Sequence, residues 1–506
     1  MAEDSKPAGE GQAAKPKLPW SRIIIPAIIA LAVVLWIRGS IDITTVKSIF
    51  AFIFILGAAV VLHEFGHFIV AKLLGIRVET FSVGFGPSLW GRKWGTTEYR
   101  ISAIPLGGYV KLGGDESNAP IEGAGASDIP EKEQFMLRPR WQKFLVAVAG
   151  PVMNILTALA IPFIGGLMYG VPVPPAPVVR EIARGGAAEA AGLQKGDHVI
   201  SFNGVDNPNW GRIHGDSLLS PEKPLPLVVD RGGQKISMTI TPARRVEKGE
   251  ILGDIGFEPD WGDVRVVVVD VIPNSPAAEA GLKVGDRIVA LGGEPVPSDQ
   301  YVTEYVKSHK GQPIRMAIER DGQQQEITAT ARPLADGTER LGLSPRDLIP
   351  RQPAGVMGSL RYAWESNLEI LRLTGKALGQ FFSGERSARN TLSGPLGIYD
   401  AAAASVNEAG WAGIFNMLGF LSLSLGIFNL LPIPVLDGGA IFLLLVEAVM
   451  ALGGWKLSMR VRERIQQVGF VMLLLLMGFV ITNDLLKKVS RAPEETKPPA
   501  ATQPQK

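Results

Sequence analysis

The chain has 506 residues, of which 46% are hydrophobic and 20% charged, with a net charge of +2 and a mean hydropathy of +0.18. This composition is too apolar for a purely soluble protein and too polar for a membrane bundle alone, so we expect membrane segments joined to soluble domains. The nearly balanced charge gives no indication of nucleic-acid binding, and the absence of cysteine excludes disulfides, thiolate metal sites and cysteine nucleophiles.

The N-terminal region differs from the rest of the chain. Residues 1–22 are polar and rich in Lys, Pro and Gly, which predicts a disordered tail and not a cleavable signal peptide. Residues 23–37 are apolar; they are few for a membrane span, which needs about 17–25 residues, but Trp20 and Trp36 are placed to anchor the ends. We therefore predict an extra N-terminal transmembrane helix at 23–37.

Residues 48–74 form a second apolar segment, which carries the pattern HExxH at His63, Glu64 and His67. On a helix the two histidines lie on one face, so their imidazoles can bind one metal ion, and Glu64 can act as general base on a water molecule there. An ionisable group in a membrane helix costs at least about 2.5 kcal/mol, and the chain has only 5 histidines. A zinc site therefore explains the pattern better than two packed histidines do.

Within residues 80–112, residues 97–104 alternate in β fashion after a Gly-rich stretch, which predicts a strand there. A third apolar segment follows at 144–169. We assign residues 48–170, which contain these features, to the first part of a membrane core.

An internal repeat occupies the soluble middle of the chain. Residues 186–204 align with residues 275–293 at a constant offset (275 − 186 = 89), which pairs Asp197 with Asp286. Strand-like segments flank both copies, so we expect two β-rich domains of about 85 residues each, at 171–259 and 260–346.

Both copies resemble PDZ domains of the form found in bacterial envelope proteases. The resemblance rests on a short helix stopped by Gly, followed by a tight Gly-Asp turn into an apolar strand. It implies a groove in which a peptide segment binds as an added strand. The alternative that one or both copies only block access sterically stays open.

Residues 356–410 are assigned to an amphipathic helix and linker. Apolar residues at helical spacing predict a surface or membrane-skimming helix: Leu360, Trp364, Leu368, Leu371 and Leu378. Residues 411–486 are assigned to the second part of the membrane core, with a last span at about 468–486, and residues 487–506 to a second disordered tail.

The sequence NLLPIPVLDGG at 429–439 interrupts the second part of the core. Pro432 and Pro434 each remove a backbone donor and fix φ, so no regular helix crosses them. Unwound backbone at membrane depth is tolerated only where protein buries it or water reaches it. The segment therefore either lines a polar cavity or simply joins two spans.

A catalytic zinc site needs a third protein ligand. His198, His214 and His309 belong to the soluble repeats, and Glu447 belongs to a regular helical stretch. Asp437 stands directly after the proline break and before two glycines, and is therefore the predicted third ligand. The alternative role for Asp437, as the N-cap of the following helix, is compatible with this prediction.

The order of these features resembles the site-2 protease family of intramembrane zinc metalloproteases, over about residues 48–486. Shorter matches agree: GFGP at 84–87, IPLGGYVKL at 104–112 and AGPVMN at 149–154. The resemblance implies that Zn²⁺ is bound by His63, His67 and Asp437, that Glu64 is the base, and that Asn429 holds the substrate backbone or the oxyanion.

The resemblance also implies a multi-pass protein of the bacterial inner membrane with its PDZ domains in the periplasm. It implies a membrane-associated β-hairpin at 80–112 whose edge pairs with the unwound substrate; a plain cytoplasmic hairpin is the alternative. Its expected substrates are single-span membrane proteins, such as an anti-sigma factor trimmed beforehand by another protease; remnant signal peptides are the alternative. The family usually begins at the HExxH helix, so a spanning 23–37 would put the N-terminus on the opposite side of the membrane. Basic residues in the N-terminal tail support that topology, and those of the C-terminal tail run against it.

Two functions from other classes are alternatives. A PDZ-bearing membrane scaffold or chaperone with an inactive metal site would bind no zinc and would not depend on Glu64. A serine protease with tandem PDZ domains would need a nucleophilic serine with His and Asp in a β-barrel domain, and no segment fits one. The apolar flanks of HExxH disfavour a soluble zinc protease.

Overall fold

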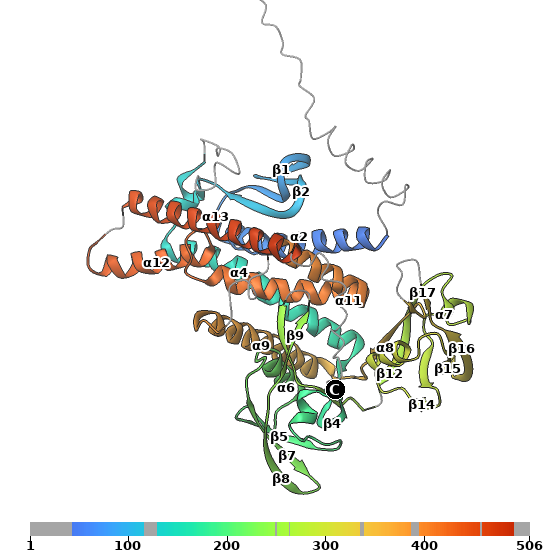
Figure 1. The fold of residues 1–506 in the computed structure, drawn as a ribbon. Helices are drawn as coiled ribbons and strands as arrows, with labels where there is room; N and C mark the ends of the chain where they lie inside the picture. Colours follow the sequence, from blue (N-terminus) through green and yellow to red (C-terminus); the bar gives the residue numbers. More distant parts are fainter. Residues whose placement is uncertain are drawn as a thin grey trace, which may run out of the picture. The chain divides into compact units, whose positions relative to one another are not determined.

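The computed structural model describes residues 43–115, 129–247, 250–262, 264–333, 339–385, 394–455 and 458–489. The predicted extra helix at 23–37, the tail at 1–22 and most of the tail at 487–506 lie outside these residues. The chain divides into two compact units, one of residues 1–162 with 392–506 and one of residues 163–391 (Figure 1).

Long apolar helices form the first unit. Within the described residues, four helices are long and apolar enough to span a membrane: α2 (Ile43–Leu73), α4 (Arg140–Tyr169), α11 (Pro395–Leu430) and α13 (Met459–Val489, over Arg464–Lys487). A shorter helix, α12 (Asp437–Leu452), stands between α11 and α13 in the chain. With the two β-rich domains of the second unit, these helices confirm the predicted α-helical membrane protein with inserted β-rich domains.

Helices α2 and α11 pack through a cluster of buried small and aliphatic residues. Ala51, Ala59 and Ala402 are fully buried in it beside Ile55 and Ile414. Small side chains let two helix backbones approach closely, which is how helices associate where lipid removes the usual hydrophobic driving force.

The start of α11 lies in the segment 356–410, which the sequence assigns to an amphipathic helix and linker. Residues 395–410 of this segment are helical. The helix bends at Gly410, whose φ of 56° and ψ of −133° suit glycine because it has no Cβ.

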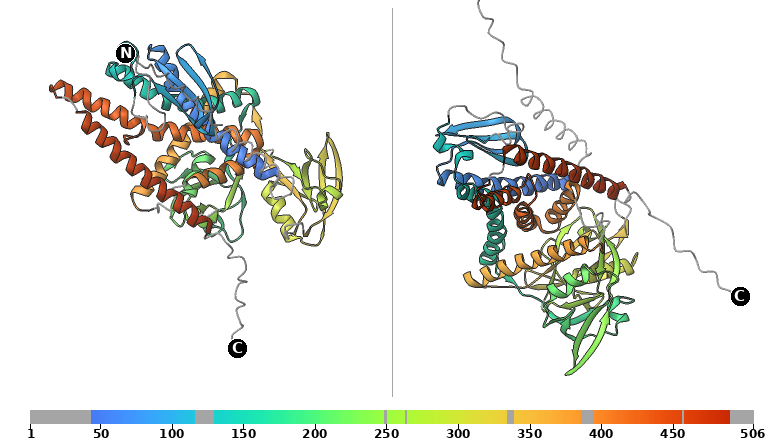
Figure 2. Two further views of the ribbon diagram at one scale, coloured as in Figure 1. Left: turned by 90° about the horizontal axis from the view of Figure 1, so that it is seen from above. Right: turned by 90° about the vertical axis from the view of Figure 1, so that its left-hand side faces the viewer.

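The predicted β-hairpin consists of β1 (Val78–Trp94) and β2 (Thr97–Leu112), which lie against α2 (Figures 1 and 2). A Cβ on Gly57 of α2 would lie 2.6 Å from the carbonyl oxygen of Pro105, so glycine permits this close approach. The rings of Phe68, Phe81 and Tyr99 pack together where α2 leads into the hairpin. Two short 3-10 helices, Glu131–Glu133 and Phe135–Leu137, precede α4.

The first PDZ-like domain is a six-stranded sheet in the order β11-β4-β5-β7-β8, with β6 paired to β5. Val199, Phe202 and Ile213 are fully buried in its core. Its elements in chain order are β4 (Ala176–Ile182), α5 (Ala187–Ala190), β5 (His198–Phe202), β6 (Val205–Asp206), α6 (Trp210–Leu218), β7 (Leu225–Arg231), β8 (Gln234–Ile240), β9 (Ala243–Glu247), β10 (Glu250–Asp254) and β11 (Phe257–Asp260).

The second PDZ-like domain is a six-stranded sheet in the order β16-β15-β13-β12-β19, with β14 paired to β13. Leu291, Met316 and Ile318 are fully buried in its core. Its elements in chain order are β12 (Arg265–Val271), α7 (Pro276–Glu279), β13 (Arg287–Leu291), β14 (Glu294–Pro295), α8 (Asp299–Ser308), β15 (Pro313–Arg320), β16 (Gln323–Thr330), β17 (Arg332–Pro333), β18 (Glu339–Arg340) and β19 (Leu343–Leu348).

The repeated Gly-Asp turn has the same stabilising ion pair in both domains. Asp197 accepts hydrogen bonds from Arg231 at 2.7 Å, and Asp286 accepts them from Arg320 at 2.6 Å. The arginines keep the offset of the repeat (320 − 231 = 89). Both carboxylates are buried, so the repeat conserves a charge pair that closes each turn.

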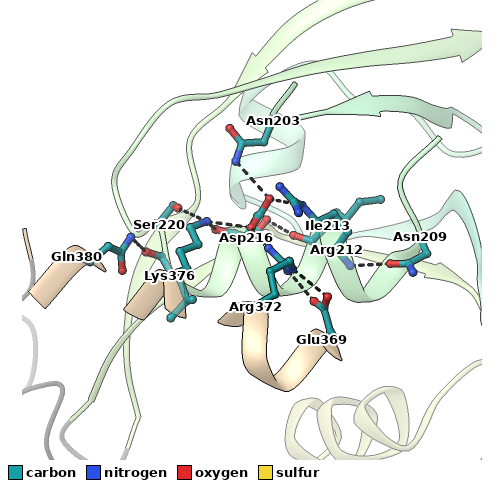
Figure 3. Close-up of polar contacts among 12 residues, drawn as sticks. Asn203, Asn209, Arg212, Ile213, Asp216, Ser220, Glu369, Arg372, Lys376 and Gln380 are labelled. Atoms are coloured by element: carbon teal, nitrogen blue, oxygen red, sulfur yellow. Dashed lines mark hydrogen bonds and ion pairs between the residues drawn. The ribbon is translucent and has the colours of Figure 1, made fainter. Parts of the chain in front are cut away.

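The ends of the double-domain insertion meet. β3 (Val171–Pro172) pairs with β20 (Arg351–Gln352), and helix α9 (Gly355–Phe382) follows at the predicted amphipathic segment. Arg372 and Lys376 of α9 contact the buried carboxylate of Asp216 in α6 at 2.8 and 2.9 Å (Figure 3). Ion pairs and hydrogen bonds therefore fix α9 to the first PDZ-like domain.

Candidate metal centre

Helix α2 brings His63 and His67 to one face, as their four-residue spacing predicts. The two Nε2 atoms lie 3.2 Å apart. The helix can approach α4 here because Gly66 has no Cβ: a Cβ at that position would lie 2.3 Å from the carbonyl oxygen of Ala149. Both imidazoles are therefore held where the backbones of α2 and α4 approach closely.

Asp437 completes a group of three ligand atoms. Its Oδ2 lies 2.9 Å from His63 Nε2 and its Oδ1 lies 3.5 Å from His67 Nε2. The three candidate ligand atoms lie within 4.8 Å of one another, although Asp437 is 370 residues from His67 in the chain (437 − 67 = 370). The predicted third ligand, Asp437, thus lies next to the two histidines although it comes from a remote part of the chain.

The proline break positions this aspartate. After α11 the chain runs through Pro432 and Pro434 to Val435, whose φ of 85° is unusual for a β-branched residue and marks a sharp turn. α12 then begins at Asp437, and its N-cap is Leu436, without a side-chain capping bond. Asp437 therefore faces the histidines and is not the N-cap of α12.

In each histidine Nδ1 makes a hydrogen bond, so that Nε2 is left to face the candidate metal site. His67 Nδ1 lies 2.7 Å from the carbonyl oxygen of Val146, so this nitrogen donates and Nε2 carries the lone pair. His63 Nδ1 lies 3.2 Å from the side-chain amide of Asn154. Metal-binding histidines commonly donate their second N–H in this way.

Asn154 supports the same tautomer for His63. It is fully buried in α4, and its Oδ1 is a buried acceptor without a partner among the described residues. A half-turn of the amide places Oδ1 beside His63 Nδ1, where it accepts the imidazole N–H and satisfies both groups. Two imidazoles and one carboxylate are a donor set that fits catalytic Zn²⁺.

Gly150 leaves the space that the imidazoles occupy. A Cβ at this position would lie 2.4 Å from His67 Nε2 and 2.8 Å from His63 Cε1. Gly150 and Asn154 stand four residues apart on α4, and thus on the face toward α2. Both residues belong to the AGPVMN segment, where their four-residue spacing on a helix is the one sequence signal for this role.

The other two predicted residues also lie at this centre. The carboxylate of Glu64 accepts a hydrogen bond from the backbone N–H of Val110 and interacts electrostatically with His63, His67 and Asp437. Asn429, in the last turn of α11, has its Nδ2 3.3 Å from His63 Nε2. The structure thus brings every predicted site residue together.

Comparison with known proteins gives the family. The model named Peptidase family M50 matches residues 51–476. The chain is 32% identical over 465 residues to "Regulator of sigma-E protease RseP" of Escherichia coli, covering 86% of this chain and 97% of that protein. It is 31% identical over 473 residues to "Putative zinc metalloprotease" of Vibrio cholerae, covering 86% and 98%.

Among the solved structures that are similar to part of the chain is the PDZ domain of the SdrC-like protein of Listeria innocua. That match has 25% sequence identity and a TM-score of 0.15, and it covers 16% of this chain and 92% of the other. The family match and the full-length relatives agree with a group of three candidate metal ligands, two of which lie on a helix long and apolar enough to span a membrane. The chain therefore belongs to peptidase family M50 and is an intramembrane zinc metalloprotease.

Proposed function

We propose that this protein hydrolyses peptide bonds inside the transmembrane segments of single-span membrane proteins. The proposal rests on the convergence of His63, His67 and Asp437, with both histidines on a helix long and apolar enough to span a membrane. Backbone in a lipid layer must satisfy its hydrogen bonds internally. A protease acting there therefore needs a built-in polar centre, and these residues supply one.

In this proposal His63, His67 and Asp437 hold a zinc ion, which when bound supplies a Lewis acid and makes water nucleophilic near neutral pH. Glu64 accepts the proton from the attacking water and passes it to the amine of the leaving peptide. The N–H of Val110 orients the Glu64 carboxylate for this transfer.

Asn429 is proposed as the group that stabilises the reacting carbonyl. Its Nδ2 lies next to His63, so it can donate a hydrogen bond to an oxygen that gains negative charge beside the ligands. Asn429 lies in the last turn of α11. The helix ends directly after it, before the two prolines of the proline break.

As substrate we propose a membrane-bound anti-sigma factor, trimmed beforehand by another protease, in regulated intramembrane proteolysis for envelope stress signalling. The support is the name of the similar Escherichia coli protein, a regulator of sigma-E protease. The match covers 97% of that protein. The edge of the β1–β2 hairpin is proposed to pair with the unwound substrate strand.

We further propose that the PDZ-like domains lie in the periplasm. Lys72, Arg77, Arg92 and Lys93 follow the end of α2, which favours the cytoplasmic side for that end. α4, which is long and apolar enough to cross a membrane once, then leads to the PDZ-like domains. There they bind peptide segments or exclude untrimmed substrates by size.

Zinc analysis combined with cleavage of a model transmembrane peptide tests the proposal. Wild type is expected to hold one zinc ion per chain and to cleave the peptide. Glu64→Gln should keep the zinc and lose cleavage by a factor of at least about 10², whereas Asp437→Ala should lose both. A Glu64→Gln variant that cleaves like wild type, or a wild type that holds no zinc, would support the inactive scaffold instead.

A further inference from the structure

The end of the β1–β2 hairpin carries a pocket of aromatic and basic side chains. It is lined by Trp90, Arg92, Lys93, Trp94 and Tyr99. Trp90 is 56% exposed and Trp94 is 79% exposed. Two large aromatic side chains exposed in the last residues of β1 indicate a contact surface.

The charge around the pocket is positive. Arg92, Lys93 and Arg100 face a single acid, Glu98, which gives +2 for the hairpin end (3 − 1 = 2). Glu98 is bound by Arg100 at 2.6 Å. Among the described residues, neither Arg92 nor Lys93 has a carboxylate within ion-pair distance. Lys93 lies opposite Glu98 in the strand pairing and interacts with it only at longer range, and both basic side chains are exposed to a bound anion.

The contacts of the hairpin end place the pocket near the C-terminal end of helix α2. Thr97 Oγ1 donates to the carbonyl oxygen of Val78 at 2.8 Å, and Val78 is the first strand residue after α2. Tyr99, which lines the pocket, has its ring 6.0 Å from that of Phe68, one helical turn before Lys72. The pocket therefore lies near the last turn of α2, a helix long and apolar enough to span a membrane.

Apolar side chains continue from the pocket along the strands, away from the turn of the hairpin. The register aligns Trp90 with Ile101, and Ile101 with Val83, further along the strands from the turn. Ile101, Ile104 and Leu89 are exposed there. At about 3.3 Å per residue, the four residues from Lys93 to Leu89 extend about 13 Å from the basic end.

We propose that this pocket binds the phosphate headgroup of an anionic phospholipid of the surrounding bilayer. Arg92 and Lys93 pair with the phosphate, since guanidinium and ammonium groups are strong phosphate donors. Trp94 and Tyr99 lie in the interfacial layer that Trp and Tyr prefer. The exposed apolar part of the hairpin contacts the acyl chains, which a soluble anion would not engage.

Quenching of tryptophan fluorescence by brominated lipids tests this inference on the full-length protein in phosphatidylcholine vesicles. One set of vesicles contains a minor fraction of brominated phosphatidylglycerol and another the same fraction of brominated phosphatidylcholine. The contribution of Trp94 is the difference between wild type and Trp94→Phe. The charge variant is Arg92→Gln with Lys93→Gln, and the matched control is Lys195→Gln with Lys235→Gln, which removes the same charge from exposed positions of the first PDZ-like domain.

We expect brominated phosphatidylglycerol to quench Trp94 more than brominated phosphatidylcholine does. The charge variant should lower this preference about tenfold, because each basic residue near an anionic surface strengthens lipid attraction, and the control should keep it. Equal quenching by both lipids, or equal behaviour of the charge variant and the control, would overturn the inference. Loss of the preference on adding inorganic phosphate would overturn it too, because the site would then take a soluble anion.

Discussion

Gly150 and Asn154 show how single residues of α4 determine the metal site on α2. Gly150 leaves space for the rings, and Asn154 provides the acceptor that fixes the tautomer of His63. Neither residue is a metal ligand. Their effects should therefore appear in zinc affinity before they appear in the fold.

For Asn154, the informative changes are to Leu and to Asp. Asn154→Leu should lower zinc affinity about 10- to 100-fold, because His63 loses the acceptor for its Nδ1 proton. Asn154→Asp keeps an acceptor at the same position and should retain most of the affinity. Competition with a chelator on the purified protein measures both, and equal affinity of the Leu variant and wild type would contradict the role of Asn154.

For Gly150, a single methyl group should abolish the site. Gly150→Ala would put Cβ 2.4 Å from His67 Nε2, so we expect loss of both zinc and proteolysis. The matched control is Gly165→Ala in the same helix, where no atom lies within 4 Å of the new Cβ. That variant should behave as wild type, and equal zinc contents of the two alanine variants would refute the steric argument.

Among the elements, α9 depends on a charge cluster for its position. Asp216 is fully buried and accepts from Arg212, Arg372, Lys376 and Asn203 (Figure 3). Burial alone would raise the pKa of Asp216, but hydrogen bonds from Arg372, Lys376 and Asn203 lower it to about 2. The stabilisation is thus fully present above the ordinary value of 3.8 and is lost as the pH falls through about 2.

Arg372→Met tests this attachment. It should cost about 1.5–3 kcal/mol and increase hydrogen exchange in the second half of α9, because the buried carboxylate loses a charged donor. Arg361→Met on the same helix removes an exposed ion pair with Glu365 and should change stability by less than about 0.5 kcal/mol. Similar exchange in both variants would show that the helix is held by other contacts.

The second PDZ-like domain is expected to respond to pH in the opposite sense. Burial and the neighbouring charge of Asp299 raise the pKa of Asp347 to about 6 from 3.8. The folded domain therefore binds this proton more tightly than the unfolded chain does, and its stability rises as the pH falls through 6 toward 4. Resistance of this domain to proteolysis should increase between about pH 7.5 and pH 5, and Asp347→Asn should remove that increase; an unchanged increase would assign it to other groups.

At the scale of the whole molecule, the two PDZ-like domains form one insertion in the protease. Pairing of Val171–Pro172 with Arg351–Gln352 brings the start and the end of the insertion together. The insertion can therefore be shortened without separating the segments that carry the metal ligands.

Deletion of residues 175–346 keeps both paired strands and tests the proposed gating. The shortened protein should cleave a full-length, untrimmed substrate that the complete protein leaves intact, because two bulky domains no longer exclude it. Cleavage of the trimmed substrate is the control and should continue in both proteins. If the deletion leaves the discrimination between the two substrates unchanged, size exclusion by these domains is wrong.

Features that depend on local spacing could be predicted from the sequence alone. The four-residue spacing of His63 and His67 places them on one helix face, and the apolar segments predict the membrane spans. The constant offset predicts two similar domains with Asp197 and Asp286 in equivalent turns. Asp437 could be selected because few other acids or histidines lie in the apolar segments. These inferences needed only periodicity and composition.

The contacts between α4 and α2 could be learned only from the tertiary structure. The partners of the ligands, Val146, Gly150 and Asn154, carry no metal-binding signal of their own, because their role arises from the packing of α4 on α2. The helical state of residues 395–410 is visible only in the structure, because this polar and alanine-rich stretch has no clear apolar period. Contacts between distant parts of a chain are set by packing and charge in three dimensions, and a linear pattern does not contain them.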